Sequence, residues 1–220
     1  MVHTQAVEDY LKTIYDLQNT QEKVTTTMLA ERLQVAPASV TSMLKKLSDM
    51  HLVKYAPYQG VTLTEAGQKI ALEVIRHHRL IELYLAEALG VPWDQVHDEA
   101  EKWEHVLSEE VERRMDAALG HPTTDPHGAP IPNREGVMIS PNRVPLTSLE
   151  VGQSAVIAEV SDHDPEMLRY LGRLGLYPQT PIHLLVIAPF NGPLTIRAGG
   201  AEHVLGREVA NHILVTNVQP

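Results

Sequence analysis

A run of histidine and carboxylate residues occupies positions 97–105 of the chain. If the run is helical, at about 100° per residue, four side chains fall within an arc of about 100° on one face: His97, Glu101, Glu104 and His105. Upstream, His78 and Glu82 have the i, i+4 spacing that also shares a helix face. Carboxylates that converge repel each other unless a cation neutralises them. The run therefore predicts a divalent-metal site, with a solvated acidic helix face as the alternative.

The available donors are oxygen and imidazole nitrogen, because the chain contains no cysteine. This set suits octahedral Mn(II) or Fe(II) better than tetrahedral zinc. The absence of cysteine also excludes disulfide scaffolds and cysteine nucleophiles. The zinc-protease spacing is absent, since His97 and His105 lie eight residues apart, and no P-loop, dinucleotide or nucleophile-elbow motif occurs. A metal-dependent hydrolase and a non-regulatory metal-binding adaptor are the less favoured alternatives.

The N-terminal third has the order of a winged helix-turn-helix. Apolar residues predict a helix near 4–17, a second from Thr25 to Leu33 and a third from Pro37, followed by short strands at 52–55 and 61–63. In the third helix Val40, Leu44 and Leu47 would face the core. The outer face would meet DNA, with small side chains entering the major groove and lysines contacting phosphates. The candidate DNA-binding residues are Ala36, Ala38, Ser39, Thr41, Ser42, Lys45, Lys46 and, in the wing, Tyr58.

Three further segments follow this domain. Helices are expected at 64–89, 93–107 and 108–119, and a second surface is needed to cover them, which favours a helical dimerisation region. Six of the fifteen prolines lie in a connecting arm, and short strand-like runs then predict a small barrel. The expected fold class is mainly α with a small β domain. The predicted domains are 1–63 (winged helix-turn-helix), 64–120 (helical dimerisation and metal binding), 121–146 (connecting arm) and 147–220 (small barrel).

The formal charge of −10 at first argues against a nucleic-acid partner. However, residues 1–63 carry six basic and six acidic side chains, whereas residues 64–120 carry six and thirteen. The DNA-reading segment is thus neutral, and much of the acidic excess surrounds the candidate metal ligands. The sequence has no secretory signal and no run of about 20 apolar residues, so we expect a cytoplasmic protein without membrane association.

Several motifs, in order along almost the whole chain, resemble the diphtheria-toxin-repressor family of metal-dependent transcription regulators. They are Asp9–Tyr15, His78-Arg79-Leu80, Val96–His105, Glu109–Arg114 and Pro126–Pro132. The resemblance implies a winged DNA-binding domain, a helical dimerisation and metal-binding domain, and a C-terminal SH3-like (FeoA-like) domain. These domains match the segments inferred above.

The resemblance also implies two metal sites, or about two ions per chain. The primary site would use Asp9, Glu101, Glu104 and His105. Iron-type members carry sulfur ligands where this chain has Asp9 and Glu101, so the resemblance points to the manganese type, with Fe(II) as the alternative metal. Lys12 stands where some manganese-type members have a glutamate, which counts against their closely spaced metal pair. The ancillary site would use His78, Glu82 and His97, completed by Glu159 and Asp162 or, with a shift of register, by His163 or Asp164.

The implied function is regulation of transcription rather than catalysis. A metal-loaded homodimer would bind a double-stranded DNA operator and repress metal-uptake genes, with no small-molecule substrate beyond metal ions. Because a two-fold dimer must present its recognition helices about 34 Å apart or a multiple of that spacing, bound metal would favour the matching conformer.

Overall fold

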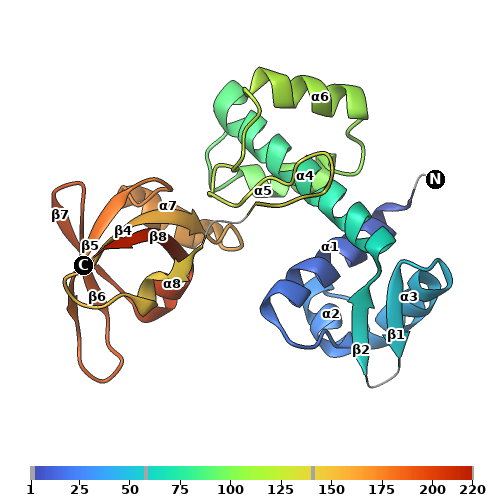
Figure 1. The fold of residues 1–220 in the computed structure, drawn as a ribbon, viewed down its shortest axis with the longest axis horizontal. Helices are drawn as coiled ribbons and strands as arrows, with labels where there is room; N and C mark the ends of the chain where they lie inside the picture. The colour runs from blue at the N-terminus through green and yellow to red at the C-terminus, as the bar shows by residue number, and fades with distance from the viewer. Residues whose placement is uncertain (1–2, 57–58, 140–141, 220) are drawn as a thin grey trace. The chain divides into compact units, whose positions relative to one another are not determined.

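A computed structural model describes residues 3–56, 59–139 and 142–219 (Figure 1). It divides into two compact units, of which the first comprises residues 1–77, 104–107 and 132–137 and the second comprises the remainder. The N-terminal part is helical with a two-stranded sheet, and the C-terminal part is a six-stranded sheet. This architecture confirms the predicted fold class. In the part of the chain that the structure describes, no helix is long and apolar enough to cross a membrane.

Three helices form the N-terminal core: α1 (Gln5–Thr20), α2 (Thr26–Leu33) and α3 (Pro37–Asp49). The hydroxyl of Thr25 caps α2 by accepting a hydrogen bond from the backbone N–H of Met28, and Pro37 occupies the first turn of α3. The predicted inward residues of α3 are fully buried beside residues of α1, which confirms both apolar stripes: Val7, Leu11, Ile14, Val40, Leu44 and Leu47.

The wing consists of β1 (Val53–Ala56) and β2 (Gly60–Leu63), an antiparallel pair. Val61 also bridges to Val24, which ties the hairpin to the start of α2. Gly60 has φ +92°, and a Cβ atom there would lie 2.7 Å from the carbonyl oxygen of Val24. Only glycine fits this close approach. The elements therefore form the predicted winged helix-turn-helix.

The helical segment contains α4 (Glu65–Leu89), α5 (Val96–Trp103) and α6 (Glu109–Ala118). The prediction of a helix from 93 to 107 is wrong at both ends. Glu104 and His105 lie in a turn after α5, where the imidazole Nδ1 of His77 is 3.1 Å from the Glu104 carbonyl oxygen and donates to it. This contact satisfies a carbonyl outside the helical pattern. The acidic and histidine side chains of 97–105 therefore do not share one helix face.

The C-terminal sheet has the order β3-β8-β4-β5-β6-β7, with every neighbouring pair antiparallel. Its strands are β3 (Val144–Pro145), β4 (Ser154–Val160), β5 (Pro181–Ile187), β6 (Leu194–Ala198), β7 (Ala201–Leu205) and β8 (Ile213–Gln219). A short 3₁₀ helix (Leu146–Ser148) and helices α7 (Pro165–Arg173) and α8 (Arg207–Asn211) complete it. The sequence did not predict β3, β7 or α8. Edge strand β7 is mostly exposed and lacks an alternating apolar pattern.

The connecting arm is ordered around a tight turn at residues 125–129. The Asp125 carboxylate accepts hydrogen bonds from the backbone N–H groups of His127 and Ala129. Gly128 has φ +89°, and a Cβ atom there would lie 2.0 Å from the carbonyl oxygen of Ala158. The His127 carbonyl accepts a hydrogen bond from the N–H of Val160 in β4. The turn is therefore fixed directly against the sheet.

Candidate metal centres and DNA-facing surface

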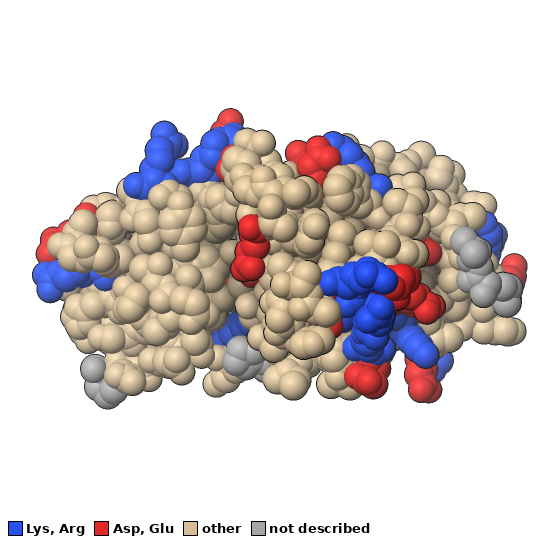
Figure 2. Space-filling model, turned by 90° about the horizontal axis from the view of Figure 1, so that it is seen from above, with Lys and Arg blue, Asp and Glu red and all other residues tan. Residues whose placement is uncertain are grey.

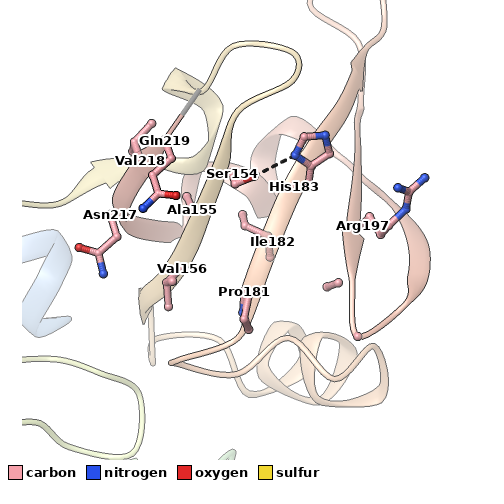
Figure 3. Close-up of a pocket in the computed structure, with 12 residues that line it drawn as sticks. Ser154, Ala155, Val156, Pro181, Ile182, His183, Arg197, Asn217, Val218 and Gln219 are labelled. Atoms are coloured by element: carbon pink, nitrogen blue, oxygen red, sulfur yellow. Dashed lines mark hydrogen bonds between the residues drawn. The ribbon is translucent and has the colours of Figure 1, made fainter.

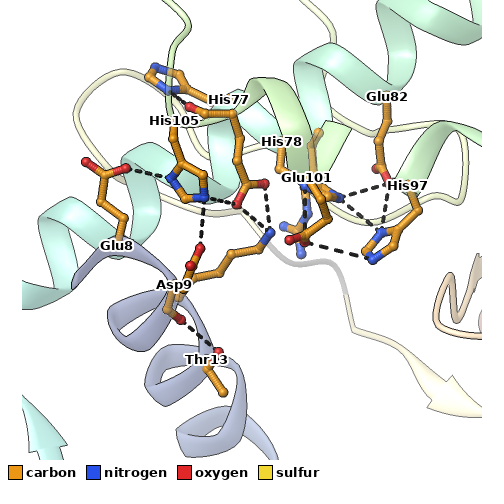
Figure 4. A network of polar contacts seen from close by, with 12 residues as sticks. Glu8, Asp9, Thr13, His77, His78, Glu82, His97, Glu101 and His105 are labelled. Atoms are coloured by element: carbon orange, nitrogen blue, oxygen red, sulfur yellow. Dashed lines mark hydrogen bonds and ion pairs between the residues drawn. The ribbon is translucent and has the colours of Figure 1, made fainter. Parts of the chain in front are cut away.

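The first cluster of ligating side chains joins Asp9 of α1 to the turn after α5 (Figure 4). The Nε2 atom of His105 lies 2.8 Å from Asp9 Oδ1 and 3.3 Å from Glu104 Oε1. Glu104 is buried at 1% exposure. A buried carboxylate needs a cationic partner, so this arrangement suits a metal ion or a positively charged side chain.

Two residues outside the predicted ligand set contact members of this cluster. Glu8 Oε2 lies 2.7 Å from His105 Nδ1, on the opposite side of the ring from Asp9. Lys12 Nζ donates to both oxygens of Glu104, at 3.0 and 2.8 Å. No sequence pattern indicated Glu8, because its proximity to His105 depends on where α5 ends.

The surrounding carboxylates change the protonation of His105. Burial alone would lower the pKa of its imidazole, but Asp9, Glu8 and Glu104 together raise this pKa to about 9. Without metal the ring is therefore an imidazolium at neutral pH. Its charge and that of Lys12 balance part of the local negative charge.

The second cluster contains His78, Glu82, His97 and Asp162, whose nearest ligating atoms lie within 4.8 Å of one another. Glu82 Oε1 lies 3.0 Å from His78 Nε2 and 3.3 Å from His97 Nδ1. Asp162 Oδ2 lies 3.4 Å from the same His97 nitrogen. The structure thus brings together the three helical residues of the predicted ancillary site and one residue from the C-terminal domain.

The other candidates at 159–164 have different partners. Glu159 forms an ion pair with Arg143, and Asp164 caps α7 through the N–H groups of residues 166 and 167. His163 Nδ1 lies 3.0 Å from Asp162 Oδ1, the oxygen not facing His97. Asp162 is therefore the carboxylate of this run that reaches the cluster.

Glu101, the remaining predicted ligand, lies on α5 and faces residues of the second cluster. Its Oε1 atom is 3.7 Å from His78 Nδ1 and 3.9 Å from His97 Nε2, and 44% of its side chain is exposed (Figure 4).

A third set of buried donors adjoins the second cluster through Glu82, and the sequence had not assigned it. Asp125 and His127 of the arm lie against Glu82, with His127 Nδ1 at 3.8 Å from Glu82 Oε2. In the described part of the chain, three buried atoms here make no hydrogen bond: Glu82 Oε2, Asp125 Oδ2 and His127 Nδ1. Buried polar atoms without hydrogen bonds are costly, so these donors are a candidate ligand site, in which the Arg79 guanidinium, 3.7 Å from Asp125 Oδ2, supplies positive charge.

Electrostatic effects are strong around Glu82. Burial would raise the pKa of Glu82, yet His78, His127 and His97 hold it well below its usual value. Burial would lower the pKa values of His97 and His127, but the neighbouring carboxylates raise them to about 10 and about 9. Burial, together with the charge of Glu82, raises the pKa of Asp125 to about 7. The imidazolium groups thus neutralise the carboxylates when no metal is bound.

The donor sets fit a hard divalent cation. They contain carboxylate oxygens and imidazole nitrogens without sulfur, which favours Mn(II) or Fe(II) coordination. Octahedral bonds of roughly 2.1 Å place adjacent donors about 3 Å apart. The contacts from Glu82 to His78 and from His105 to Asp9 have this spacing.

The outer face of α3 is mostly solvent-exposed, including Ala36, Ala38, Ser39, Ser42, Lys45 and Lys46. Thr41 is half-buried and its hydroxyl donates to the carbonyl of Pro37. Tyr58 lies outside the described residues. A cavity of about 460 Å³ beside this face is lined by Lys23, Thr25, Thr26, Thr41, Lys45, Tyr55 and Gly60. Ammonium and hydroxyl groups of this kind suit DNA phosphates.

The described surface visible in Figure 2 has no large patch of side chains of one charge. In Figure 2 basic and acidic side chains are interspersed on the face shown. Residues 1–63 carry equal numbers of basic and acidic side chains, so this segment has no formal net charge.

A second cavity, of about 570 Å³, lies on the C-terminal sheet between the ends of β4, β5, β6 and β8 (Figure 3). Ser154 and His183 form a hydrogen bond of 3.0 Å in its wall. Its described lining contains neither a carboxylate nor a tyrosine, tryptophan or phenylalanine. The cavity thus lacks both a metal-ligand set and the aromatic groove that Pro-rich peptides require.

Family models match all three parts of the chain. Residues 3–61 match the N-terminal DNA-binding domain of iron-dependent repressors, and residues 64–133 match the metal-binding and dimerisation domain of the same family. The chain belongs to the iron-dependent repressor family. Residues 144–217 match the FeoA domain. The resemblance inferred from the sequence is confirmed, and the chain is a metal-dependent transcriptional repressor by family.

Relatives match this repressor over 96% of its length. The iron-dependent repressor IdeR of Mycobacterium tuberculosis (strain ATCC 25618 / H37Rv) is 35% identical and covers 96% of both chains. A solved manganese-dependent transcriptional repressor in complex with manganese is 39% identical, with a TM-score of 0.90 over 96% of this chain and 99% of that one. ScaR with bound Cd²⁺ is 33% identical, with a TM-score of 0.82 over 96% and 98%. These relatives are repressors, which confirms the expectation that the chain is not an enzyme.

Proposed function

We propose that this repressor senses Mn(II), with Fe(II) as the alternative metal, and binds its operator as a metal-loaded homodimer. One observation carries the proposal: Asp9 of the DNA-binding domain contacts His105 and lies in one cluster with it and Glu104. A cation bound there would supply positive charge to side chains from both the DNA-binding helix α1 and the turn after α5. We also propose that the first three segments of the chain end at residues 63, 120 and 146.

The charges of the chain's own residues determine which conformer a bound cation would favour. In the metal-free state Lys12 and the imidazolium of His105 face the three carboxylates of Glu8, Asp9 and Glu104. Further positive charge therefore favours the conformer in which these carboxylates converge. If that conformer also fits the operator, metal and DNA bind with reciprocal coupling, typically of about 1–3 kcal/mol.

The ancillary site in this proposal uses His78, Glu82, His97 and Asp162, with Asp125 and His127 as additional donors around Glu82. Membership of Glu101 in the primary site stays a prediction, since within its own unit Glu101 faces His78 and His97. Carboxylates at Asp9 and Glu101 and the absence of cysteine support manganese. The likeness to a repressor solved with manganese supports it as well. The relatives named iron-dependent keep Fe(II) as the alternative.

Selection of operator sites from a random duplex pool tests this function. The protein is incubated with the pool at fixed salt with Mn(II), with anaerobic Fe(II), with Mg(II) or with chelator. We expect enrichment of a two-fold symmetric site with Mn(II) and none with chelator. Equal enrichment with and without metal, or none under any condition, would contradict the proposal, and stronger enrichment with Fe(II) would reverse the metal assignment.

A further inference from the structure

Glu8 and Asp9 are consecutive residues of α1, and their carboxylates contact the two different nitrogens of one imidazole ring (Figure 4). Glu8 Oε2 is 2.7 Å from His105 Nδ1, and Asp9 Oδ1 is 2.8 Å from His105 Nε2. The His105 side chain is 6% exposed and that of Glu8 is 18% exposed. Water therefore has little access to replace Glu8 as the acceptor for Nδ1.

The partner of one imidazole nitrogen decides which nitrogen can bind a metal. When Nδ1–H donates to Glu8, the lone pair of the neutral ring lies on Nε2. That atom faces Asp9 and Glu104, the other members of the cluster. Glu8 itself is not among the side chains whose ligating atoms converge there. Its carboxylate contacts the ring from the side away from the cluster.

We infer that Glu8 is a positioning residue, which fixes the tautomer and orientation of His105 so that Nε2 is presented to the divalent cation. This inference rests on the proposed primary metal site. In this arrangement α1 has two connections to the turn after α5. Asp9 belongs to the metal cluster itself, whereas Glu8 acts through the imidazole.

Two alternatives give different results on substitution. If Glu8 contributed only its negative charge, Glu8→Gln and Glu8→Ala would weaken metal binding equally. If it positions His105, Glu8→Gln retains a carbonyl oxygen that accepts Nδ1–H and should bind metal more tightly than Glu8→Ala. Moreover, an effect that acts through His105 disappears when His105 is absent.

The experiment measures Mn(II) affinity of the full chain by equilibrium dialysis, in a His97→Ala background that disables the second cluster. Glu8→Ala should weaken binding by about 10–100-fold, Glu8→Gln by less, and neither should weaken it further once His105→Ala is present. Glu31→Ala, at an exposed position of α2, is the matched control. Circular dichroism of the metal-free variants confirms folding.

The outcomes separate this inference from the metal site on which it depends. If His105→Ala leaves Mn(II) affinity unchanged, the proposed primary site itself is wrong. The positioning role is overturned if His105→Ala weakens Mn(II) binding but Glu8→Ala does not. It is also overturned if Glu8→Ala and Glu8→Gln weaken Mn(II) binding equally, whether His105 is present or replaced by alanine.

Discussion

Lys12 and Glu104 form a nearly buried ion pair in which one ammonium group contacts both carboxylate oxygens, at 3.0 and 2.8 Å. The Lys12 side chain is 15% exposed and that of Glu104 is 0% exposed. Because Glu104 is also a proposed metal ligand, Lys12 would share this carboxylate with a bound metal ion. It joins α1 to the turn after α5 in the metal-free protein.

Substitution of Lys12 should make the repressor more dependent on metal for stability. Lys12→Gln leaves Glu104 buried without its ammonium partner, so the metal-free protein should lose up to about 3–5 kcal/mol. The rise in Tm at saturating Mn(II) should then exceed that of the wild type. Thermal unfolding with and without Mn(II) measures both effects, with Lys69→Gln at an exposed position of α4 as the control. An equal rise in Tm for Lys12→Gln and Lys69→Gln would show that Lys12 and metal do not share Glu104.

Metal binding should release protons. The pKa values of His97, His105 and His127 are raised to about 10, 9 and 9 in the metal-free protein, so all three rings are charged at neutral pH. Ligation requires neutral imidazole, so each ring that binds metal must lose one proton. Apparent Mn(II) affinity should therefore rise from about pH 6 to pH 8.

Calorimetry in buffers of different ionisation enthalpy counts the released protons. His105→Ala should reduce the count by about one, whereas His121→Gln, at a largely exposed histidine, should leave it unchanged. A heat of binding that is independent of the buffer would contradict this prediction.

Trp93 should report ligand binding at the third set of donors. Its carbonyl accepts the Nε2–H of His127 at 2.7 Å, and its ring stacks on that imidazole with centroids 5.7 Å apart. Since the chain has only two tryptophans, Trp103→Phe leaves Trp93 as the single emitter. We expect its emission to change on addition of Mn(II), and the change to be lost in His127→Ala. An identical response in both variants would exclude ligation by His127.

Lys45 should contact a DNA phosphate. It is exposed on α3 and lines the cavity beside the wing. Loss of one phosphate contact should reduce the slope of log K against log salt by about 1, with little change in sequence preference. Operator titrations of Lys45→Gln over a salt series measure this slope, and Lys69→Gln is the control. An unchanged slope would remove Lys45 from the interface.

The fold could be predicted from the sequence in segments where apolar or ligating residues recur at helical spacing. The stripe of Val40, Leu44 and Leu47 predicted the buried face of α3, and the i, i+4 pair of His78 and Glu82 predicted a contact found at 3.0 Å. Both depend on the geometry of a single helix.

The remaining parts of the site depend on loops and on chain ends, for which the sequence has no periodic signal. Asp125 and His127 reach Glu82 because the turn at Gly128 packs against β4. Among residues 159–164, Asp162 is the carboxylate that faces His97, because Asp164 caps α7 and Glu159 pairs with Arg143, and neither contact has a periodic signal in the sequence. Glu8 reaches His105 because α5 ends at Trp103, four residues before the predicted end.

The central claim is that Asp9 couples metal binding to operator binding, and it is tested most directly by operator affinity with and without Mn(II) at fixed salt. The comparison uses the wild type, Asp9→Asn and Asp98→Asn, which makes the same charge change at an exposed position of α5. We predict that Mn(II) tightens operator binding by about 5–150-fold in the wild type and in Asp98→Asn, and that Asp9→Asn loses most of this gain. A gain of the same size in Asp9→Asn would contradict the account.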